Sequence, residues 1–134
     1  MRVKICGIKN EAELEIAVNA GADAIGFLVG QRFPSPDFIL PDKAARLAAL
    51  LPPFVTPVLV THLTEPEEIA ELIERTGVTT VQLHGGSSVE QVRTLRRLFC
   101  PFPQTRCRKL WSFLCYEVCF DCPYSVPQFL LISR

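Results

Sequence analysis

The chain has 134 residues, which is enough for one domain and too few for two of ordinary size. Its 14 basic and 14 acidic residues cancel, and this balance argues against nucleic acid or an anionic membrane as the main partner. Apolar residues make up 49% of the chain, so a packed core is expected. The first residues lack the apolar region of a signal peptide, and the longest apolar stretch, residues 47–60, contains three prolines and is too short to span a bilayer. These features predict a cytoplasmic protein.

The composition of the chain changes near residue 100. All seven glycines lie at or before Gly86, and no alanine follows Ala70. The last 35 residues contain five of the six cysteines, the single tryptophan, both tyrosines and four of the nine phenylalanines. We therefore interpret residues 1–99 and residues 100–134 separately.

The first predicted unit is a strand followed by a helix. Residues 3–8 show the period of two that is typical of a short strand, with Lys4 and Cys6 on one face. Asn10 and Glu13 have the spacing of a capping box and predict the start of a helix. The apolar side of this helix is formed by Leu14, Ile16, Ala17 and Val18.

The second unit begins with residues 22–29, which are almost entirely apolar, as expected for a parallel strand covered by helices. A loop over residues 30–41 follows. Asp42 has the position of an N-cap for a helix that runs to about Leu51 and is stopped by Pro52.

The third and fourth units repeat this order. Residues 55–61 predict a strand, and residues 64–67 have the pattern of a second capping box with an early proline. The helix that they begin ends at Gly77. Residues 79–84 predict the fourth strand, and residues 87–90 predict the capping box of a fourth helix. The third helix is expected to bury Ile69, Leu72 and Ile73.

Strict alternation of strands and helices predicts an α/β fold with a parallel sheet and right-handed crossovers. The spacing fits an open doubly wound sheet and a closed barrel equally well. In both architectures, active groups collect at the carboxyl ends of the strands.

Several polar side chains stand at or near such strand ends. Cys6, His62 and His84 each stand at the end of a predicted strand. Lys4 lies two residues before Cys6, and Gln82 lies two residues before His84, so each pair shares one face of its strand. If the apolar neighbours of these residues face the helices, the polar set points into a barrel. Each residue also has an ordinary interpretation, because a cysteine in a strand is often a small buried hydrophobe and a histidine often makes a structural hydrogen bond.

Four segments together resemble the phosphoribosylanthranilate isomerase family of tryptophan biosynthesis, in the same order over about residues 3–98. They are residues 3–8 with Asn10, residues 21–27, residues 51–55 and residues 81–85. The resemblance implies a (β/α)8 TIM barrel, of which this chain carries about four β/α units. It also implies an Amadori rearrangement of N-(5-phosphoribosyl)anthranilate, a small phosphorylated substrate, without metal or organic cofactor.

The resemblance places Cys6 at the position of the general base, which removes the proton at C2 of the ribose-derived imine. A thiolate can do this once a nearby cation lowers the pKa of the thiol, and Lys4 lies on the same strand face. The family's general acid and phosphate-binding loops have no counterpart in this sequence. The chain as it stands is therefore expected to be an inactive fragment.

The resemblance also indicates candidate substrate-binding residues. Asp37 stands where the family carries a loop arginine for the substrate carboxylate, and Arg32 is the candidate to replace it. Gln82 and His84 are the other candidates. The ordinary interpretation of Arg32 and Asp37 is that of solvated loop charges.

Three interpretations compete for residues 100–134. The first is a frameshift or a misread gene end, the second is a metal site, and the third is a secreted disulfide module, which conflicts with the cytoplasmic expectation. The metal site would use Cys107, Cys115, Cys119 and Cys122. For the whole chain, the alternatives to an isomerase are a Cys-rich metal-binding module and a non-catalytic half-barrel that associates with another half through its unpaired sheet edge.

Overall fold

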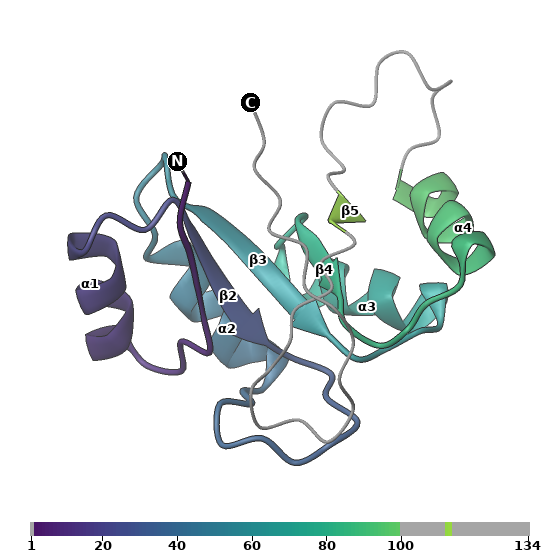
Figure 1. Cartoon of the computed structure of the whole chain (residues 1–134), viewed down its shortest axis with the longest axis horizontal. Coiled ribbons are helices and arrows are strands. Elements are labelled where there is room, and N and C mark those ends of the chain that lie inside the picture. Colours follow the sequence, from purple (N-terminus) through teal and green to yellow (C-terminus); the bar gives the residue numbers. More distant parts are fainter. Residues whose placement is uncertain (1, 100–111, 114–134) are drawn as a thin grey trace.

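The computed structural model describes residues 2–99 and 112–113 (Figure 1). These residues form five strands and four helices that alternate along the chain. The elements are β1 (Lys4–Cys6), α1 (Glu11–Asn19), β2 (Ala24–Leu28), α2 (Pro41–Ala49), β3 (Thr56–Thr61), α3 (Pro66–Thr76), β4 (Val81–Leu83), α4 (Val89–Phe99) and β5 (Ser112–Phe113). The predicted order of four strand–helix units is confirmed.

The strands form one parallel sheet in the order β1-β2-β3-β4-β5, so each strand lies beside its neighbour in the chain. One helix connects each of the first four strands to the next, as a parallel pairing requires. The expectation of an unpaired edge after the fourth strand is wrong at two positions, because Val81 pairs with Ser112 and Gln82 with Phe113. These pairings give the backbone of β4 partners on that side.

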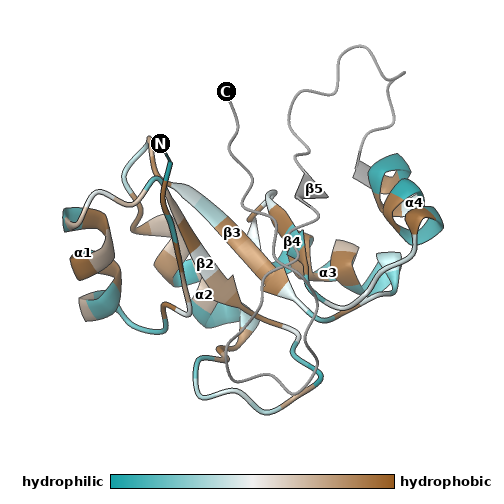
Figure 2. Cartoon of the chain, in the orientation of Figure 1, coloured by the Kyte–Doolittle hydropathy of each residue, from teal (hydrophilic) through white to brown (hydrophobic). Residues whose placement is uncertain are grey.

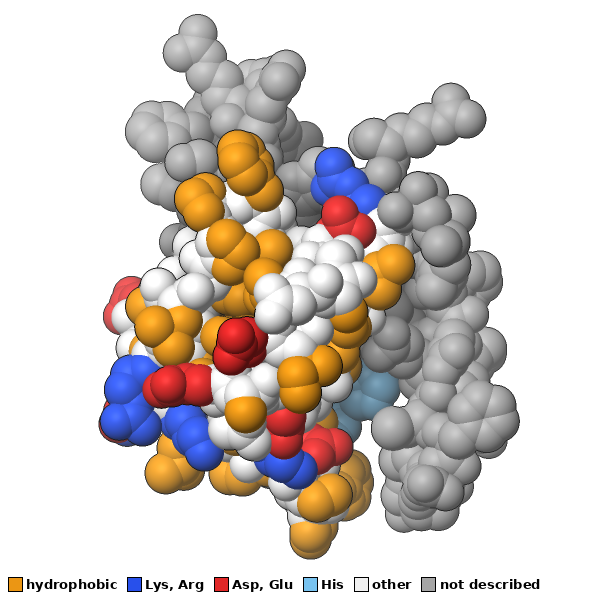
Figure 3. Space-filling model, turned by 90° about the vertical axis from the view of Figure 1, so that its left-hand side faces the viewer, with side chains coloured by type: hydrophobic (Ala, Val, Ile, Leu, Met, Phe, Trp, Pro, Cys, Tyr) orange, Lys and Arg blue, Asp and Glu red, His pale blue; other side chains and the backbone are white. Residues whose placement is uncertain are grey.

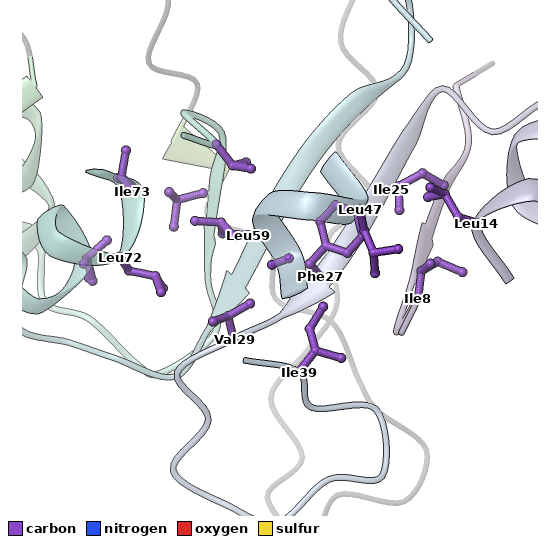
Figure 4. Packing of buried hydrophobic residues seen from close by; sticks show 14 of the residues in the cluster. Ile8, Leu14, Ile25, Phe27, Val29, Ile39, Leu47, Leu59, Leu72 and Ile73 are labelled. Carbon is purple, nitrogen blue, oxygen red and sulfur yellow. The ribbon is translucent and has the colours of Figure 1, made fainter. Parts of the chain in front are cut away.

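The hydrophobic core lies between the sheet and the helices. Ile25 and Phe27 of β2 and Leu59 of β3 are fully buried, and Leu47 of α2 belongs to the same cluster. Figure 4 shows these four side chains gathered in the cluster, and Figure 2 shows polar residues on the helices and apolar residues along the central strands. Burial of each such side chain stabilises the fold by about 1.5–3 kcal/mol.

A contact across the sheet shows that the sheet is curled. The Lys4 ammonium donates a hydrogen bond to the side-chain oxygen of Gln82, although two strands separate β1 from β4. In a flat sheet these strands would be ~14 Å apart, too far for the two side chains to meet. Since Val81 and Leu83 belong to the helix-facing core, Lys4 and Gln82 occupy the opposite, concave face. This geometry is that of a partial barrel rather than an open sheet.

Two predicted helix signals are confirmed. The Glu13 backbone N–H donates to the Asn10 side chain at 2.9 Å, and the Asn10 amide donates back to the Glu13 carboxylate at 2.8 Å. This reciprocal pair is a capping box. Gly77 ends α3 with a φ of 69°, a left-handed conformation that glycine adopts without strain.

Two other predicted caps are wrong, because a proline begins each helix. Leu40 is the N-cap of α2, and the Asp42 carboxylate instead accepts a hydrogen bond from Arg75 on α3 at 2.9 Å, which lowers the pKa of Asp42. Glu65 is the N-cap of α3 and makes no side-chain capping bond. Proline suits the first helical position because its φ is already helical and no N–H is needed there.

The fourth helix begins one residue later than predicted, and one apolar side chain of the first helix is exposed. The capping box of α4 is formed by Ser88 and Gln91, with the Ser88 N–H donating to the Gln91 side chain at 2.8 Å. Ile16 is 70% exposed, so only Leu14 and Ala17 are buried on α1.

Basic and acidic side chains lie side by side on the face that Figure 3 presents, mixed with scattered apolar residues. Within residues 2–99 and 112–113, no helix has both the length and the apolar character needed to cross a membrane. The predicted cysteine metal site of the tail falls outside the described residues.

Candidate active site

Cys6 is the last residue of β1 and lies exposed at the carboxyl end of the sheet. It is paired with Gly26 on β2, and a Cβ atom at residue 26 would come within 2.4 Å of the Cys6 Sγ. The next residue, Gly7, has a φ of 84° and donates its N–H to the Gly26 carbonyl at 3.0 Å. Glycine at residue 26 therefore leaves the space that the Cys6 thiol occupies, and Gly7 allows the turn that follows it. Because Cys6 is exposed, it is not a small buried hydrophobe.

Lys4 and Gln82 meet on the concave face of the sheet, next to the strand position of Cys6. Gln82 is only 1% exposed, and its side-chain oxygen accepts the hydrogen bond from the Lys4 ammonium. The Gln82 amide nitrogen has no hydrogen-bond partner in the described part of the chain. The structure thus brings both residues to the predicted face and holds a positive charge there.

The two histidines follow adjacent strands and lie against each other. Their ring centroids are 5.1 Å apart, and the His84 N–H donates to the Thr61 carbonyl at 2.8 Å. A Cβ atom at Gly85 would come within 2.3 Å of the His62 carbonyl oxygen, so glycine allows the ends of β3 and β4 to approach this closely.

Burial lowers the pKa of His62 below its ordinary value, and the charges of His84 and Arg32 lower it further. The Arg32 guanidinium donates to the Thr64 hydroxyl at 2.7 Å, and the Phe33 ring lies edge-on to His62 with centroids 5.7 Å apart. The structure therefore brings two predicted site residues, Arg32 and His84, to the same end of the sheet. Some histidine surface is visible in pale blue in Figure 3.

Asp37, which stands where the resemblance implies an arginine, is not an isolated loop charge. Its carboxylate forms an ion pair with the Lys9 ammonium at 3.1 Å and lies 3.3 Å from the place where a Cβ atom of Gly7 would be. The pair therefore lies beside the turn that follows Cys6.

Two residues of this region were not assigned a role from the sequence. His62 carried a signal, since both histidines of the chain end adjacent predicted strands. Lys9 gave no such signal in the sequence, because its partner Asp37 is 28 residues away. Among the described residues, no group of three or more His, Cys, Asp or Glu side chains could hold a metal ion.

The fold and the site define a class of protein. The parallel β/α sheet curls until its first and fourth strands share a polar concave face. This arrangement is part of a (β/α)8 barrel. Enzymes of this class place their reactive groups at the carboxyl ends of the strands, where Cys6, His62 and His84 lie.

Comparisons with known proteins identify the family. The N-(5′-phosphoribosyl)anthranilate isomerase 2 of Methanosarcina mazei is 46% identical over 99 residues, which are 74% of this chain and 44% of that protein. The crystal structure of the phosphoribosylanthranilate isomerase of Thermotoga maritima matches with a TM-score of 0.66 and 40% identity, over 72% of this chain and 46% of that one. No family model matches the chain.

A further solved structure carries a ligand. It is a phosphoribosylanthranilate isomerase in complex with reduced 1-(o-carboxyphenylamino)-1-deoxyribulose 5-phosphate, which matches with a TM-score of 0.66 and 40% identity over 73% of this chain and 50% of that one. Over its matched part, the chain belongs to the phosphoribosylanthranilate isomerase family. It spans about half the length of the curated relatives that it matches.

Proposed function

We propose that this chain supplies the β1–β4 side of a phosphoribosylanthranilate isomerase site, with Cys6 as the general base. The observation that carries this proposal is the exposed thiol of Cys6 at the carboxyl end of β1, next to a concave face that holds the Lys4 ammonium. In the Amadori rearrangement, an acid first protonates the ring oxygen and the furanose opens to the imine, and the thiolate then takes the C2 proton of that imine. A positive charge on the same face favours the thiolate form.

The proposed substrate is N-(5-phosphoribosyl)anthranilate. A related structure holds a phosphorylated ligand with a carboxyphenylamino group, and this chemistry supports the same ligand class here. We assign Arg32, Gln82 and His84 to substrate binding. Arg32 takes the role of the family's loop arginine, whose position in this chain is occupied by Asp37. Gln82 acts through its buried amide, which Lys4 orients from across the sheet.

The proposal includes a second half. The chain matches about half the length of its relatives, and we keep the boundary between residues 1–99 and residues 100–134 as part of this proposal. Asp37 lies beside the turn that follows Cys6, and its carboxylate is already paired with Lys9. We therefore expect turnover only when a complementary half-barrel provides the general acid and the phosphate site.

The test is an isomerase assay of the full chain, alone and mixed with the separately expressed C-terminal half of the Methanosarcina mazei relative. We expect no turnover by either piece and measurable turnover by the mixture. In the mixture, Cys6→Ala should lower kcat by at least about 100-fold, the usual contribution of a general base. The matched control, Cys100→Ala, removes a thiol outside the described residues and should leave kcat unchanged. Undiminished activity of Cys6→Ala would show that the base is another group.

A further inference from the structure

An ion pair joins the turn that follows Cys6 to the loop between β2 and α2. The Lys9 ammonium and the Asp37 carboxylate lie 3.1 Å apart, although 28 residues separate them in the chain. The two side chains are 40% and 43% exposed, and ion pairs with such exposure contribute little to folding stability. The proposed function gives neither side chain a chemical role. The position of the pair beside Cys6 therefore points to a role other than folding.

Asp37 places a negative charge beside the turn. Its carboxylate oxygen lies 3.3 Å from the place that a Cβ atom of Gly7 would occupy, and Gly7 directly follows Cys6. The loop that carries Asp37 is fixed to the sheet at the next residue, because Phe38 forms a parallel bridge to Leu28 at the end of β2. The sheet therefore holds the backbone of Asp37 within reach of the turn.

Lys9 reaches Asp37 from a backbone that α1 holds in place. The Lys9 N–H donates a hydrogen bond to the Glu13 carboxylate at 2.9 Å, and Glu13 belongs to the capping box that begins α1. Other charges on the elements around Cys6 are few. Lys4 is the only charged residue of β1, and the facing strand β2 has none. The charge balance around the thiol therefore depends on Lys4, Glu13 and the ion pair.

The ion pair matters for the charge state of the thiol. A thiolate is the reactive form of cysteine, and a carboxylate close to it disfavours ionisation, because like charges repel. An unpaired Asp37 would act in this way on Cys6. The Lys9 ammonium, 3.1 Å from that carboxylate, cancels most of its field at the neighbouring residues. Lys9 therefore allows an acid to stand beside the proposed base without suppressing its thiolate.

We propose that Lys9 is a positioning residue for the Cys6 base, since its pairing with Asp37 neutralises the acid beside Cys6 and keeps the thiol able to ionise. This inference rests on the proposed function, because it concerns the group that is proposed as the base. It adds a requirement that the place of Cys6 on β1 does not include, which is a neutral net charge at the adjoining loop.

The two partners of the ion pair should have opposite effects. Lys9→Gln leaves the Asp37 carboxylate unpaired, so that a smaller fraction of Cys6 is thiolate at a given pH. Asp37→Asn leaves the Lys9 ammonium unpaired, so that a larger fraction is thiolate. A pair that only fixed the shape of the turn would respond to both substitutions in the same direction. The sign of the two changes therefore separates a charge effect from a structural one.

The test is the rate at which iodoacetamide alkylates Cys6 in the full chain, measured against pH at low ionic strength. Mass spectrometry of the peptide that contains Cys6 separates it from the other five cysteines, which all follow residue 99. We expect Lys9→Gln to react about threefold more slowly at neutral pH, with the midpoint of its pH profile moved upward. Asp37→Asn should react faster than the parent, and the double variant should return to within about twofold of it.

The matched control is Arg75→Gln, which removes the exposed ion pair between Arg75 and Asp42 on the outer helices. It should leave the alkylation of Cys6 unchanged. An unchanged rate for Lys9→Gln, a rate for Asp37→Asn that does not exceed the parent's, or a double variant as slow as Lys9→Gln would each overturn this role of Lys9.

Alkylation needs no turnover, so its outcome is independent of whether a completed barrel is active. Activity that survives Cys6→Ala in a completed barrel would refute Cys6 as the base and leave the measured effect of Lys9 on the thiol intact. Full alkylation of Lys9→Gln would instead refute the role of Lys9 and leave Cys6 as the proposed base.

Discussion

Gly26→Ala tests whether the Cys6 thiol lies against β2, as the proposed base position requires. The added Cβ atom would come within 2.4 Å of Sγ, 3.2 Å of the Cys6 Cα and 3.3 Å of the Cys6 Cβ. The first distance is far inside van der Waals contact, so the thiol must move or the two strands must separate. Gly26 has no positive φ, so the methyl group adds no strain from the backbone conformation of residue 26 itself.

Such overpacking costs about 2 kcal/mol, which corresponds to a fall of about 1.3 M in the urea midpoint for a slope of about 1.5 kcal/mol per M. The assay is urea unfolding followed by far-ultraviolet circular dichroism. In a Cys6→Ala background Sγ is absent, and the remaining contacts are only slightly tight. The same substitution should then cost less than about 1 kcal/mol. An equal cost in both backgrounds would refute the placement of the thiol.

Two further predictions concern the ends of β3 and β4. Gly85→Ala should lower the free energy of unfolding by about 2 kcal/mol or more, because the added Cβ would lie 2.3 Å from the His62 backbone oxygen. Rotation of a side chain cannot relieve an overlap with a backbone atom. Urea unfolding measures the change in stability. The pKa of His62 is lower in the folded chain than its ordinary value of 6.5, so the unfolded state binds more protons below that pH. Stability should therefore decrease as the pH falls below about 6.5, and His62→Gln should remove this part of the decrease; a pH-independent urea midpoint in the parent chain would contradict it.

Much of the fold could be predicted because its signals are local. The period of two in the strands and the capping box of Asn10 and Glu13 involve residues that are neighbours in the chain, so they survive in the sequence as patterns. The wrong cap predictions also came from local sequence patterns. Asp42 has the chemistry of a cap, but the proline before it begins the helix and Arg75, 33 residues away, takes its carboxylate.

The candidate site divides in a similar way. The sequence alone determined which residues end the strands, and it placed Cys6, His62 and His84 at one end of a parallel sheet. It could not distinguish an open sheet from a barrel, because curvature arises from pairing and packing between strands that are far apart in the chain.

Only the tertiary structure decided this point. It joins Lys4 to Gln82 across two strands, pairs Asp37 with Lys9, and sets His62 among positive neighbours. Each of these contacts links residues from separate units, and its energy depends on distance in space rather than spacing in sequence. Local pattern thus determined the elements of this half-barrel, while the curl of its sheet determined which charges meet.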